Sequence, residues 1–468
     1  MDPQQILDQL DPDQRRVAQT IGGPVQVIAG AGTGKTRALT HRIAYASAVG
    51  ALDPRATLAV TFTTTAANEI RSRLEAMGVA GVQSRTFHSA CLRQAKFFWP
   101  EIYNAQLPPV VENRSGLVVQ ACQRVGITPS DAALRQIAGE ISWTKQTNVL
   151  PESYVELASQ GHRQLSCASL EQAADAIVAY EQVKQVECVI DLDDVLLCTL
   201  ALLATESAVA RRVRRTYRHF LFDEFQDISP VQARLVDLWV GSASGDVCVV
   251  GDPAQTIHSF AGSRSIYLEK FASQRPGGVC LEMTRNYRST PQILQAANIV
   301  RGVGIDLQAV REKGPALVFG PAADPLAESV AIAQWLKDRT RDGLAWNQLA
   351  VLFRTRAQAE AIRQILADEG VPFSYGVPES TRQAVHLGTL HSAKGLEWEA
   401  VCLGGLHDGV MPHPLASSAE QIGEERRLFY VGMTRARTWL RLSWPSRVDA
   451  KVTRASRFLA DLPGLQSA

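Results

Sequence analysis

One segment of eight residues constrains the fold of this chain more than any other. The sequence AGAGTGKT, residues 29–36, follows the strand-like run VQVIA and precedes the helix-like run RALTHRIAYA. Small residues let the backbone wrap around phosphates, and a helix that begins there points its N–H groups toward the negative charge. The strand–loop–helix context therefore predicts a phosphate-binding loop, with Ala29 at a position where glycine is more usual.

Two side chains of this loop have the chemistry needed to handle a nucleoside triphosphate. Lys35 can reach the β- and γ-phosphates, and the hydroxyl of Thr36 can hold Mg²⁺. We therefore expect ATP as the substrate and Mg²⁺ as the metal ion. The residues of the loop that we expect to contact the nucleotide are Ala29, Gly30, Ala31, Gly32, Thr33, Gly34, Lys35 and Thr36.

A pair of acidic residues further along the chain adds a second component of such a site. Asp223 and Glu224 follow the apolar run HFLF, residues 219–222. A strand that ends there would place the Asp223 carboxylate at the edge of the sheet, on the Mg²⁺ shell. Glu224 could then orient and deprotonate the attacking water. An acidic pair after a strand is commonly only solvated, and the phosphate loop in the same half of the chain favours the catalytic interpretation.

Apolar strand-like runs alternate with amphipathic helical stretches along most of the chain, which predicts an α/β fold with parallel sheets flanked by helices. The strands fall into two groups on either side of residue 290. The stretch 89–206 is rich in helical periodicity and poor in strands, which predicts a helical insertion. We expect a first lobe formed by 1–88 and 207–284, interrupted by that insertion, and a second lobe over 285–468.

Composition narrows the class of protein without identifying it. Hydrophobic residues make up 46% and charged residues 20%, as in ordinary globular proteins, and the net charge of +1 argues against a histone-like binder. The eight cysteines include no CxxC pair, so we expect no iron–sulfur cluster, zinc knuckle or disulfide framework. The polar N-terminus is unlike a signal peptide, and the longest apolar run, residues 195–204, is too short to span a bilayer. These features predict a soluble cytoplasmic protein.

With both nucleotide elements in view, residues 10–445 resemble the UvrD/Rep/PcrA group of superfamily 1A helicases, whose motifs occur here in the family's order. The matching segments are LDPDQ (10–14), TFTTTAANEI (61–70), TFHS (86–89), GDPAQTIHSF (251–260), NYRS (286–289), TLHSAKGLE (389–397) and EERRLFYVGMTRA (424–436). The resemblance implies two RecA-like P-loop NTPase lobes, with the helical insertion called 1B in the first. It also implies a DNA-dependent ATPase that moves 3′→5′ along single-stranded DNA.

The resemblance assigns roles to residues outside the phosphate loop. Arg288 and Arg435 look like two arginine fingers, whose guanidinium groups would stabilise the charge on the γ-phosphate in the transition state. Gln255 resembles the residue that touches the γ-phosphate. The family implies that Gln14, Arg37 and Tyr287 contact adenine. It also implies that Glu397 lies on the nucleotide side, with a contact that the motif does not define.

A motor that moves along any sequence must grip the bases by stacking and the backbone by hydrogen bonds. The candidates for this track are Phe62, Thr86, His88, His258, Phe260, Thr389 and His391. The family commonly has larger rings where this chain has His258 and Phe260, and an Arg at the position of Ala261, which predicts a looser grip. We expect the basic run 211–220 to be a solvated helix face and the aromatic residues 97–99 to form the core of the insertion.

The insertion called 2B, which is associated with duplex contacts in this family, has no room in this chain. Only about a hundred residues separate Thr290 from Thr389, and the segment PFSYGVPESTRQAVH, residues 372–386, looks like a short bypass. The long C-terminal extension of some relatives is also missing. The resemblance therefore implies a reduced translocase whose duplex unwinding is weak or depends on a nuclease or loading partner.

Three alternatives remain open at this level. A nucleotide kinase would explain residues 29–36 and 223–224, but not Arg288 and Arg435 in a second lobe. A structural subunit that binds DNA or a protein without hydrolysis conflicts with the intact set of catalytic residues. The chain could also be the motor subunit of a larger nuclease or defence complex. The pathway, the oligomeric state and the choice between DNA and RNA are not encoded in these motifs.

Overall fold

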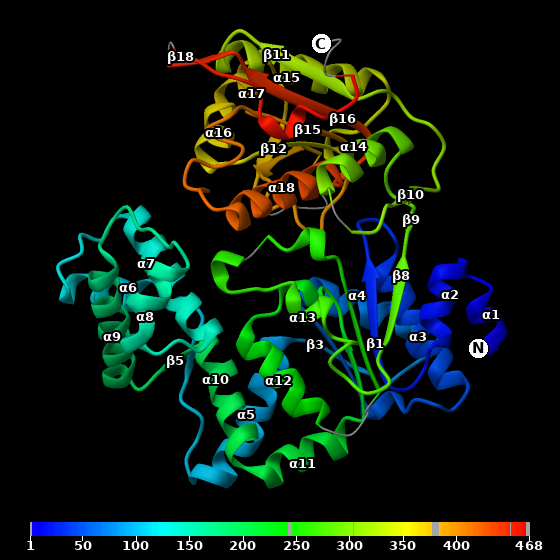
Figure 1. The fold of residues 1–468 in the computed structure, drawn as a ribbon, viewed down its shortest axis with the longest axis vertical. Helices are drawn as coiled ribbons and strands as arrows, with labels where there is room; N and C mark the ends of the chain where they lie inside the picture. The colour runs from blue at the N-terminus through cyan, green and yellow to red at the C-terminus, as the bar shows by residue number, and fades with distance from the viewer. Residues whose placement is uncertain are drawn as a thin grey trace. The chain divides into compact units, whose positions relative to one another are not determined.

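The computed structural model describes residues 2–241, 246–257, 259–302, 304–376, 383–449 and 451–464. Two compact units are formed, and each contains one six-stranded sheet (Figure 1). The first unit comprises Met1–Ile28, Lys35–Pro253 and His258–Leu281, and the second comprises Ala29–Gly34, Ala254–Ile257 and Glu282–Ala468. The boundary therefore runs through the phosphate loop. His258 and part of the predicted bypass, residues 377–382, lie outside the described residues.

The sheet of the first unit has the strand order β3-β2-β6-β7-β1-β8, and every pair from β3 to β1 is parallel. The strands are β1 (Pro24–Ala29), β2 (Thr57–Thr61), β3 (Gln83–Thr86), β6 (His219–Phe222), β7 (Asp246–Gly251) and β8 (Val279–Met283). Alternate residues such as Leu58 and Val60 face a core formed with α5 (Phe87–Tyr103), α10 (Leu192–Thr205), α11 (Ser207–Thr216) and α12 (Pro230–Val240). The adjacent N-terminal helices are α1 (Pro3–Leu7), α2 (Pro12–Gln19), α3 (Lys35–Ala48) and α4 (Thr64–Ala76), and α13 (Ile266–Glu269) follows β7.

A group of four helices in the first unit has a hydrophobic core of its own, from Leu117 to Val183 (Figure 1). These helices are α6 (Ser115–Arg124), α7 (Asp131–Thr147), α8 (Pro151–Gln160) and α9 (Leu170–Glu187). The chain enters and leaves the group through two short strands that pair in parallel, β4 (Val110–Val111) and β5 (Ile190–Asp191). Helices α5 and α10, which flank this group inside the predicted insertion 89–206, pack with the sheet instead.

The prediction for the aromatic residues 97–99 was wrong in part. All three belong to α5, whose buried face includes Ala95 and Phe98 and packs on the sheet, so they do not form the core of the insertion. Phe97 is 62% exposed, because it lies about 100° around the helix from its buried neighbour. The basic face of α11 is solvated as predicted, since Arg211, Arg212 and Arg215 are exposed while Val213 is buried.

The sheet of the second unit has the order β11-β16-β15-β12-β14-β13, with every neighbouring pair parallel. Its strands are β11 (Val318–Ala322), β12 (Leu349–Phe353), β13 (Phe373–Tyr375), β14 (Val385–Thr389), β15 (Trp398–Leu403) and β16 (Ala436–Pro445). Two further short pairs are β9 (Arg285–Asn286) with β10 (Gln308–Ala309), and β17 (Arg447–Val448) with β18 (Lys451–Val452).

Both faces of this second sheet are covered by helices, which explains why its strands are apolar throughout. In β12, Ala350 and Leu352 face a core shared with α14 (Pro291–Arg301) and α18 (Ala419–Met433). Leu349 and Val351 face the opposite core, shared with α15 (Pro325–Arg341), α16 (Arg356–Ala361) and α17 (Arg363–Asp368). The predicted α/β class with helix-flanked parallel sheets is confirmed. Within the described ranges, no helix is both long and apolar enough to cross a membrane.

Candidate nucleotide site and nucleic-acid interface

Lys35 and Asp223, which the sequence predicts at one site, act on each other electrostatically in the first unit. Lys35 is the first residue of α3, with Thr36 next to it, and Asp223 directly follows β6. Burial and the neighbouring Glu224 raise the pKa of Asp223 to about 7, while the Lys35 ammonium opposes that rise. Asp223 is therefore a buried carboxyl at the end of a central parallel strand, in the electrostatic field of the Lys35 ammonium.

A glutamine that the sequence analysis did not single out fixes the orientation of Glu224. Glu224 has a left-handed backbone (φ 53°), and its N–H donates to Oδ1 of Asp223 at 2.9 Å. Gln226 Nε2 donates to Oε2 of Glu224 at 2.6 Å, and Gln226 Oε1 accepts from the N–H of Asp252 at 3.1 Å. A Cβ on Gly251 would lie 2.2 Å from that amide oxygen. The one sequence signal was the position of Gln226, two residues after the acidic pair.

The carbonyls of Ala31 and Gly32 in the phosphate loop accept hydrogen bonds within the second unit. Asn286 Nδ2 donates to the carbonyl of Ala31 at 2.7 Å, and the N–H of Tyr287 donates to the carbonyl of Gly32 at 2.9 Å. Gly32 has φ 69°, and a Cβ there would lie 2.7 Å from Cβ of Arg288. Only glycine satisfies both the left-handed backbone and this close approach.

Two of the predicted γ-phosphate contacts, Arg435 and Gln255, are bonded to each other in the second unit. Arg435 is only 2% exposed, and its Nη2 donates to Oε1 of Gln255 at 3.1 Å. Its Nε and Nη1 donate to the carbonyls of Val431 and Leu396 at 2.9 and 3.1 Å. Lys394 Nζ donates to the carbonyl of Gln255 at 2.8 Å. The buried guanidinium therefore has a fixed direction and ends on the amide of Gln255.

Glu397 pairs with two arginines in the second unit. Its carboxylate accepts from Nε of Arg288 and from Nη1 of Arg437, the latter at 3.2 Å. Arg288 also donates to the carbonyl of Thr434 at 3.2 Å. Glu397 thus contacts the predicted arginine finger Arg288, whereas its predicted place on the nucleotide side stays a prediction.

The remaining adenine candidates are distributed over both units. Gln14 is buried in α2, where its N–H donates to Oδ1 of Asp11 at 2.9 Å. Arg37 is exposed and donates to the carbonyl of Gln9 at 2.7 Å. Tyr287, in the second unit, is 39% exposed. Arg37 and Tyr287 therefore present a polar and an aromatic group, respectively, at the surface of their own units, whereas Gln14 does not.

A cavity of about 260 Å³ in the first unit brings together two of the predicted track residues, Phe62 and His88. Phe62 is half-buried and meets the Phe87 ring edge-on, with the ring centroids 5.8 Å apart. Burial lowers the pKa of His88, and the carboxylates of Asp193 and Asp191 partly oppose that shift. The hydroxyl of Ser263 is buried without a hydrogen-bond partner among the described residues. The lining consists of Thr61, Phe62, Phe87, His88, Ser142, Gln146, Asp193, Asp227, Ser229, Gln232, Ala261 and Ser263.

The helical group holds the segment that carries Phe260, whose ring is 54% exposed. Nη1 of Arg163 donates to the carbonyl of Phe260 at 3.1 Å, and two other nitrogens of Arg163 bind the Glu140 carboxylate at 2.6 and 2.7 Å. Gly262 has φ 97°, and a Cβ there would lie 2.8 Å from Cγ2 of Thr147 in α7. Arg163 therefore helps to position Phe260, although 97 residues separate the two in sequence.

Of the other track candidates, Thr86 caps α5 by accepting the N–H of Ser89 at 3.1 Å. Thr389 ends β14, and its hydroxyl accepts the N–H of Ser392 at 3.3 Å, which puts His391 in the turn between them. These hydroxyls have structural roles that do not depend on a ligand.

Comparison with known proteins shows the family of the chain. The model of the UvrD/REP helicase N-terminal domain matches residues 10–276, and that of the UvrD-like helicase C-terminal domain matches 281–378 and 374–447. The chain belongs to the UvrD/Rep helicase family. The ATP-dependent DNA helicase UvrD2 of Mycobacterium tuberculosis is 33% identical over 554 aligned positions, covering 94% of this chain and 79% of the relative. UvrD1 of M. tuberculosis and PcrA of Bacillus subtilis are 32% and 28% identical, each over 79% of this chain and 50% of the relative.

The protein is thus a UvrD-like superfamily 1 helicase with two RecA-like lobes, and an ATP-dependent enzyme.

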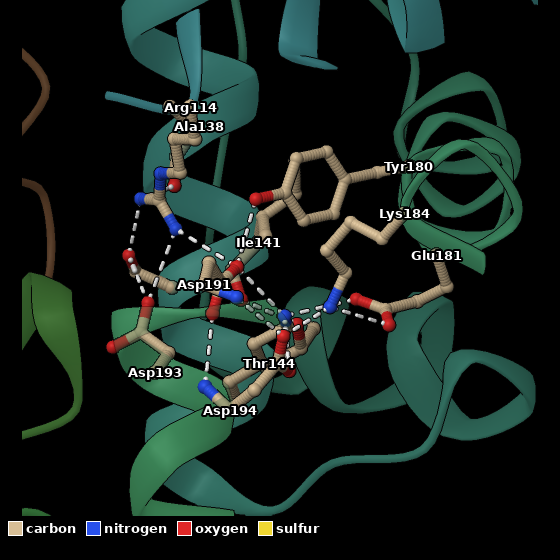
Figure 2. Close-up of polar contacts among 12 residues, drawn as sticks. Arg114, Ala138, Ile141, Thr144, Tyr180, Glu181, Lys184, Asp191, Asp193 and Asp194 are labelled. Carbon is tan, nitrogen blue, oxygen red and sulfur yellow. Dashed lines mark hydrogen bonds and ion pairs between the residues drawn. The ribbon is translucent and has the colours of Figure 1, made fainter. Parts of the chain in front are cut away.

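A buried ionic cluster in this helicase joins the helical group to α10 (Figure 2). Lys145 Nζ contacts Asp191 at 2.8 Å and Asp194 at 2.6 Å, and Lys184 Nζ also pairs with Asp194. Asp191 and Asp194 form the capping box of α10, so the same carboxylates begin the helix and bind the ammonium groups.

Proposed function

We propose that this helicase hydrolyses ATP between its two RecA-like lobes and moves along single-stranded DNA in the 3′→5′ direction. The observation that carries the proposal is the environment of Asp223, a buried carboxyl that is flanked by Glu224 and influenced by the Lys35 ammonium. The direction of movement rests on the family resemblance.

In the proposed mechanism, Lys35 binds the β- and γ-phosphates, and Glu224 accepts a proton from the attacking water. The Gln226 amide holds the Glu224 carboxylate in place while it acts as the base. Thr36 and Asp223 would hold Mg²⁺, because a hydroxyl and a carboxylate are the hard oxygen ligands this ion takes alongside phosphates. Bound there, Mg²⁺ would neutralise negative charge on the phosphates of the nucleotide.

The second lobe supplies the positive charge that the transition state requires. We propose that Arg288 and Arg435 stabilise the γ-phosphate oxygens, with Gln255 sensing whether that phosphate is present. The bond between Arg435 and Gln255 supports this assignment, since breaking or remaking it would link the nucleotide state to the segment 251–260, which also carries Phe260. Tyr287 and Arg37 would hold adenine between them, with Gln14 at its edge and Glu397 steering Arg288.

Single-stranded DNA would follow residues that grip without regard to sequence. Phe62 and Phe260 offer rings for stacking, and the uncommitted hydroxyl of Ser263 can donate to a base or a phosphate. Thr86, His88, Thr389 and His391 would extend the track, together with His258.

We propose weak or partner-dependent duplex unwinding, because the chain lacks residues that its relatives carry. The alignment with UvrD2 has 554 positions and this chain has 468 residues, so at least 86 positions, the difference, hold residues of the relative alone. The two matches to the C-terminal family model meet at residues 374–378, where the sequence suggested a bypass in place of 2B. Residues 285–468 would then form the second lobe, and the 1B insertion of the first lobe would lie within the predicted range 89–206, with α6 to α9 as its separately packed part.

The test compares ATP hydrolysis with and without an oligo(dT) strand. We expect strong stimulation by DNA, loss of turnover in Lys35→Ala, and weaker stimulation with an unchanged DNA-independent rate in Phe260→Ala. A rate that ignores DNA would favour a kinase, and no hydrolysis in the unaltered protein would favour a structural subunit.

Direction and unwinding need separate assays. Displacement of streptavidin from a 5′-biotinylated strand, but not from a 3′-biotinylated one, is expected of a 3′→5′ motor. Robust, processive unwinding of a tailed duplex by the pure protein would contradict the proposed dependence on a partner.

A further inference from the structure

A second cavity in the first unit, of about 670 Å³, lies where β3, α5 and the end of α11 meet. Its walls come from Arg85 of β3, from seven residues of α5, and from the segment 213–217. The lining residues are Arg85, Ser89, Leu92, Arg93, Gln94, Lys96, Phe97, Phe98, Val213, Thr216 and Tyr217. None of them is assigned to the nucleotide site or to the DNA track above.

The cavity combines an apolar interior with a cationic mouth. Phe98 and Val213 are buried residues of the lobe's core cluster, and Leu92 and Tyr217 pack against it. Arg93 and Lys96 are both exposed on α5. The lining residues that the structure describes include three cations and no carboxylate. A ligand that fits this cavity must therefore carry an apolar group inward and negative charge at its periphery.

The hydrogen bonds of the Arg85 guanidinium are incomplete. Its Nη2 donates to Gln83 at 2.9 Å and its Nη1 reaches Ser89 at 3.5 Å, whereas its Nε is buried without a hydrogen-bond partner among the described residues. Burial lowers the pKa of Arg85, and the positive charge of Arg93 adds to that effect. An anion placed here would relieve both the repulsion and the unmet hydrogen bond.

A neighbouring contact within the protein already has this chemistry. The guanidinium of Arg212 lies over the rings of Phe97 and Phe98, at 5.5 and 5.0 Å from their centroids. The same guanidinium binds both carboxylate oxygens of Glu101 at 2.6 Å. Aromatic, cationic and acidic groups thus already associate at the rim of the cavity.

We propose that this cavity is a docking site for an acidic peptide segment of a partner protein that inserts one bulky apolar side chain. The apolar side chain would fill the space between Leu92, Phe98 and Val213. Carboxylates on either side of it would pair with Arg85, Arg93 and Lys96. Charge complementarity at the mouth would speed association and make binding sensitive to salt.

A DNA strand fits the same cavity less well. Non-specific strand binding uses exposed ring faces on which successive bases stack. Phe98 is buried here, and Arg212 lies over the ring of Phe97, the exposed ring at the rim. An apolar anchor that enters a pocket surrounded by charged groups is a common mode of peptide recognition.

The probe for a binding test is a fluorescein-labelled peptide of eight residues in which a single Phe is flanked by Asp residues, titrated with the full chain. We expect saturable binding that weakens with NaCl and is lost when the Phe of the peptide is replaced by Ala. Arg93→Glu with Lys96→Glu should weaken binding by roughly tenfold or more. The matched control, Arg211→Glu with Arg215→Glu, reverses two exposed arginines outside the lining and should change it little.

Thr216→Trp tests the cavity without changing charge, since the indole would occupy the space and abolish binding. DNA-stimulated ATP hydrolysis should be unaltered in all these variants, which separates this proposal from the proposed motor function. Equal losses in the Arg93/Lys96 and Arg211/Arg215 variants, or binding that survives Thr216→Trp, would overturn the docking site. Displacement of the peptide by an oligo(dT) strand, dependent on Arg93 and Lys96, would assign the cavity to nucleic acid instead.

Discussion

Replacing Lys145 by Met should loosen the helical insertion of this helicase. The ammonium lies 2.8, 2.6 and 3.0 Å from the carboxylates of Asp191, Asp194 and Glu181. Without it, Asp194 keeps Lys184, but the nearest cation to Asp191 is Arg114 at 3.8 Å. Removal of one partner from a buried ion pair leaves an uncompensated charge, which costs about 3–5 kcal/mol.

Hydrogen exchange measured by mass spectrometry follows this loss directly on peptides from α7 and α9. A cost of about 3 kcal/mol corresponds to a roughly hundredfold faster exchange of their most protected amides. The matched control is Lys337→Met, which removes an ammonium that pairs with Glu369 at 2.7 Å on the surface. That pair is partly exposed and contributes about 1 kcal/mol or less.

The charge argument also predicts a rescue and a pH effect. Burial acts to raise the pKa of Asp191, but the charges of Lys145 and Lys184 and the hydrogen bonds to the carboxylate together hold that pKa below its usual range. This carboxyl therefore stabilises the native state at neutral pH and loses that effect on acidification. In Lys145→Met the same carboxyl would be protonated more readily in the folded state, so the stability gap to the parent should narrow as the pH falls toward 4. Adding Asp191→Asn should recover part of the loss. The reasoning is refuted if the double variant exchanges faster than Lys145→Met, or if Lys337→Met has an equal effect.

Three further predictions concern single side chains. Burial lowers the pKa of His386 to about 4, so its contribution to stability is complete above the unfolded pKa near 6.5 and is lost as the pH falls toward 4. His386→Leu should remove a pH-dependent part of about 3 kcal/mol from the unfolding free energy, and an unchanged pH profile would contradict this. Gly262→Ala should reduce the stimulation of ATP hydrolysis by DNA, because the added methyl group would meet Thr147. The control is Gly277→Ala, which has a similar backbone (φ 71°) but nothing within 4 Å and should leave the stimulation unchanged. Equal effects of the two changes would show that backbone strain alone is responsible. Gln226→Ala should lower kcat for ATP roughly tenfold or more with little change in KM, and a change confined to KM would assign it to binding.

The parts of the site that sequence predicts well are those in which a short motif fixes its own backbone. The phosphate loop requires small residues at consecutive positions, and its strand and helix neighbours are encoded on either side. Asp223 follows an apolar strand, so its place at the sheet edge follows from the strand's end. A strand that is covered on both faces sends successive side chains to opposite cores, which its own sequence encodes. In β12 these side chains are Leu349, Ala350, Val351 and Leu352.

Contacts between distant segments could not be predicted in the same way. The bond from Arg163 to the Phe260 carbonyl depends on how α7, α8 and their connecting segments pack, and neither segment alone specifies it. The exposure of Phe97 was missed because three consecutive aromatic residues suggest a core, whereas a helix places successive side chains about 100° apart. The bond between Arg435 and Gln255 joins residues 180 apart, which only the folded second unit brings together.

Contacts made by α7 join the helical insertion to the first lobe beside the proposed DNA track. Asp193, in the first turn of α10, accepts from Ser142 at 2.9 Å and from Gln146 at 2.6 Å, and all three side chains line the 260 Å³ cavity with Phe62 and His88. The same helix α7 that supplies Ser142 and Gln146 also carries Lys145, the centre of the buried ionic cluster. A change in the tilt of α7 would therefore move one wall of the cavity, and Thr147 against Gly262 would transmit it to the segment of Phe260. It follows that the ionic cluster sets the geometry of the track as well as the stability of the insertion, so its loss should weaken the response to DNA before it weakens the hydrolysis of ATP.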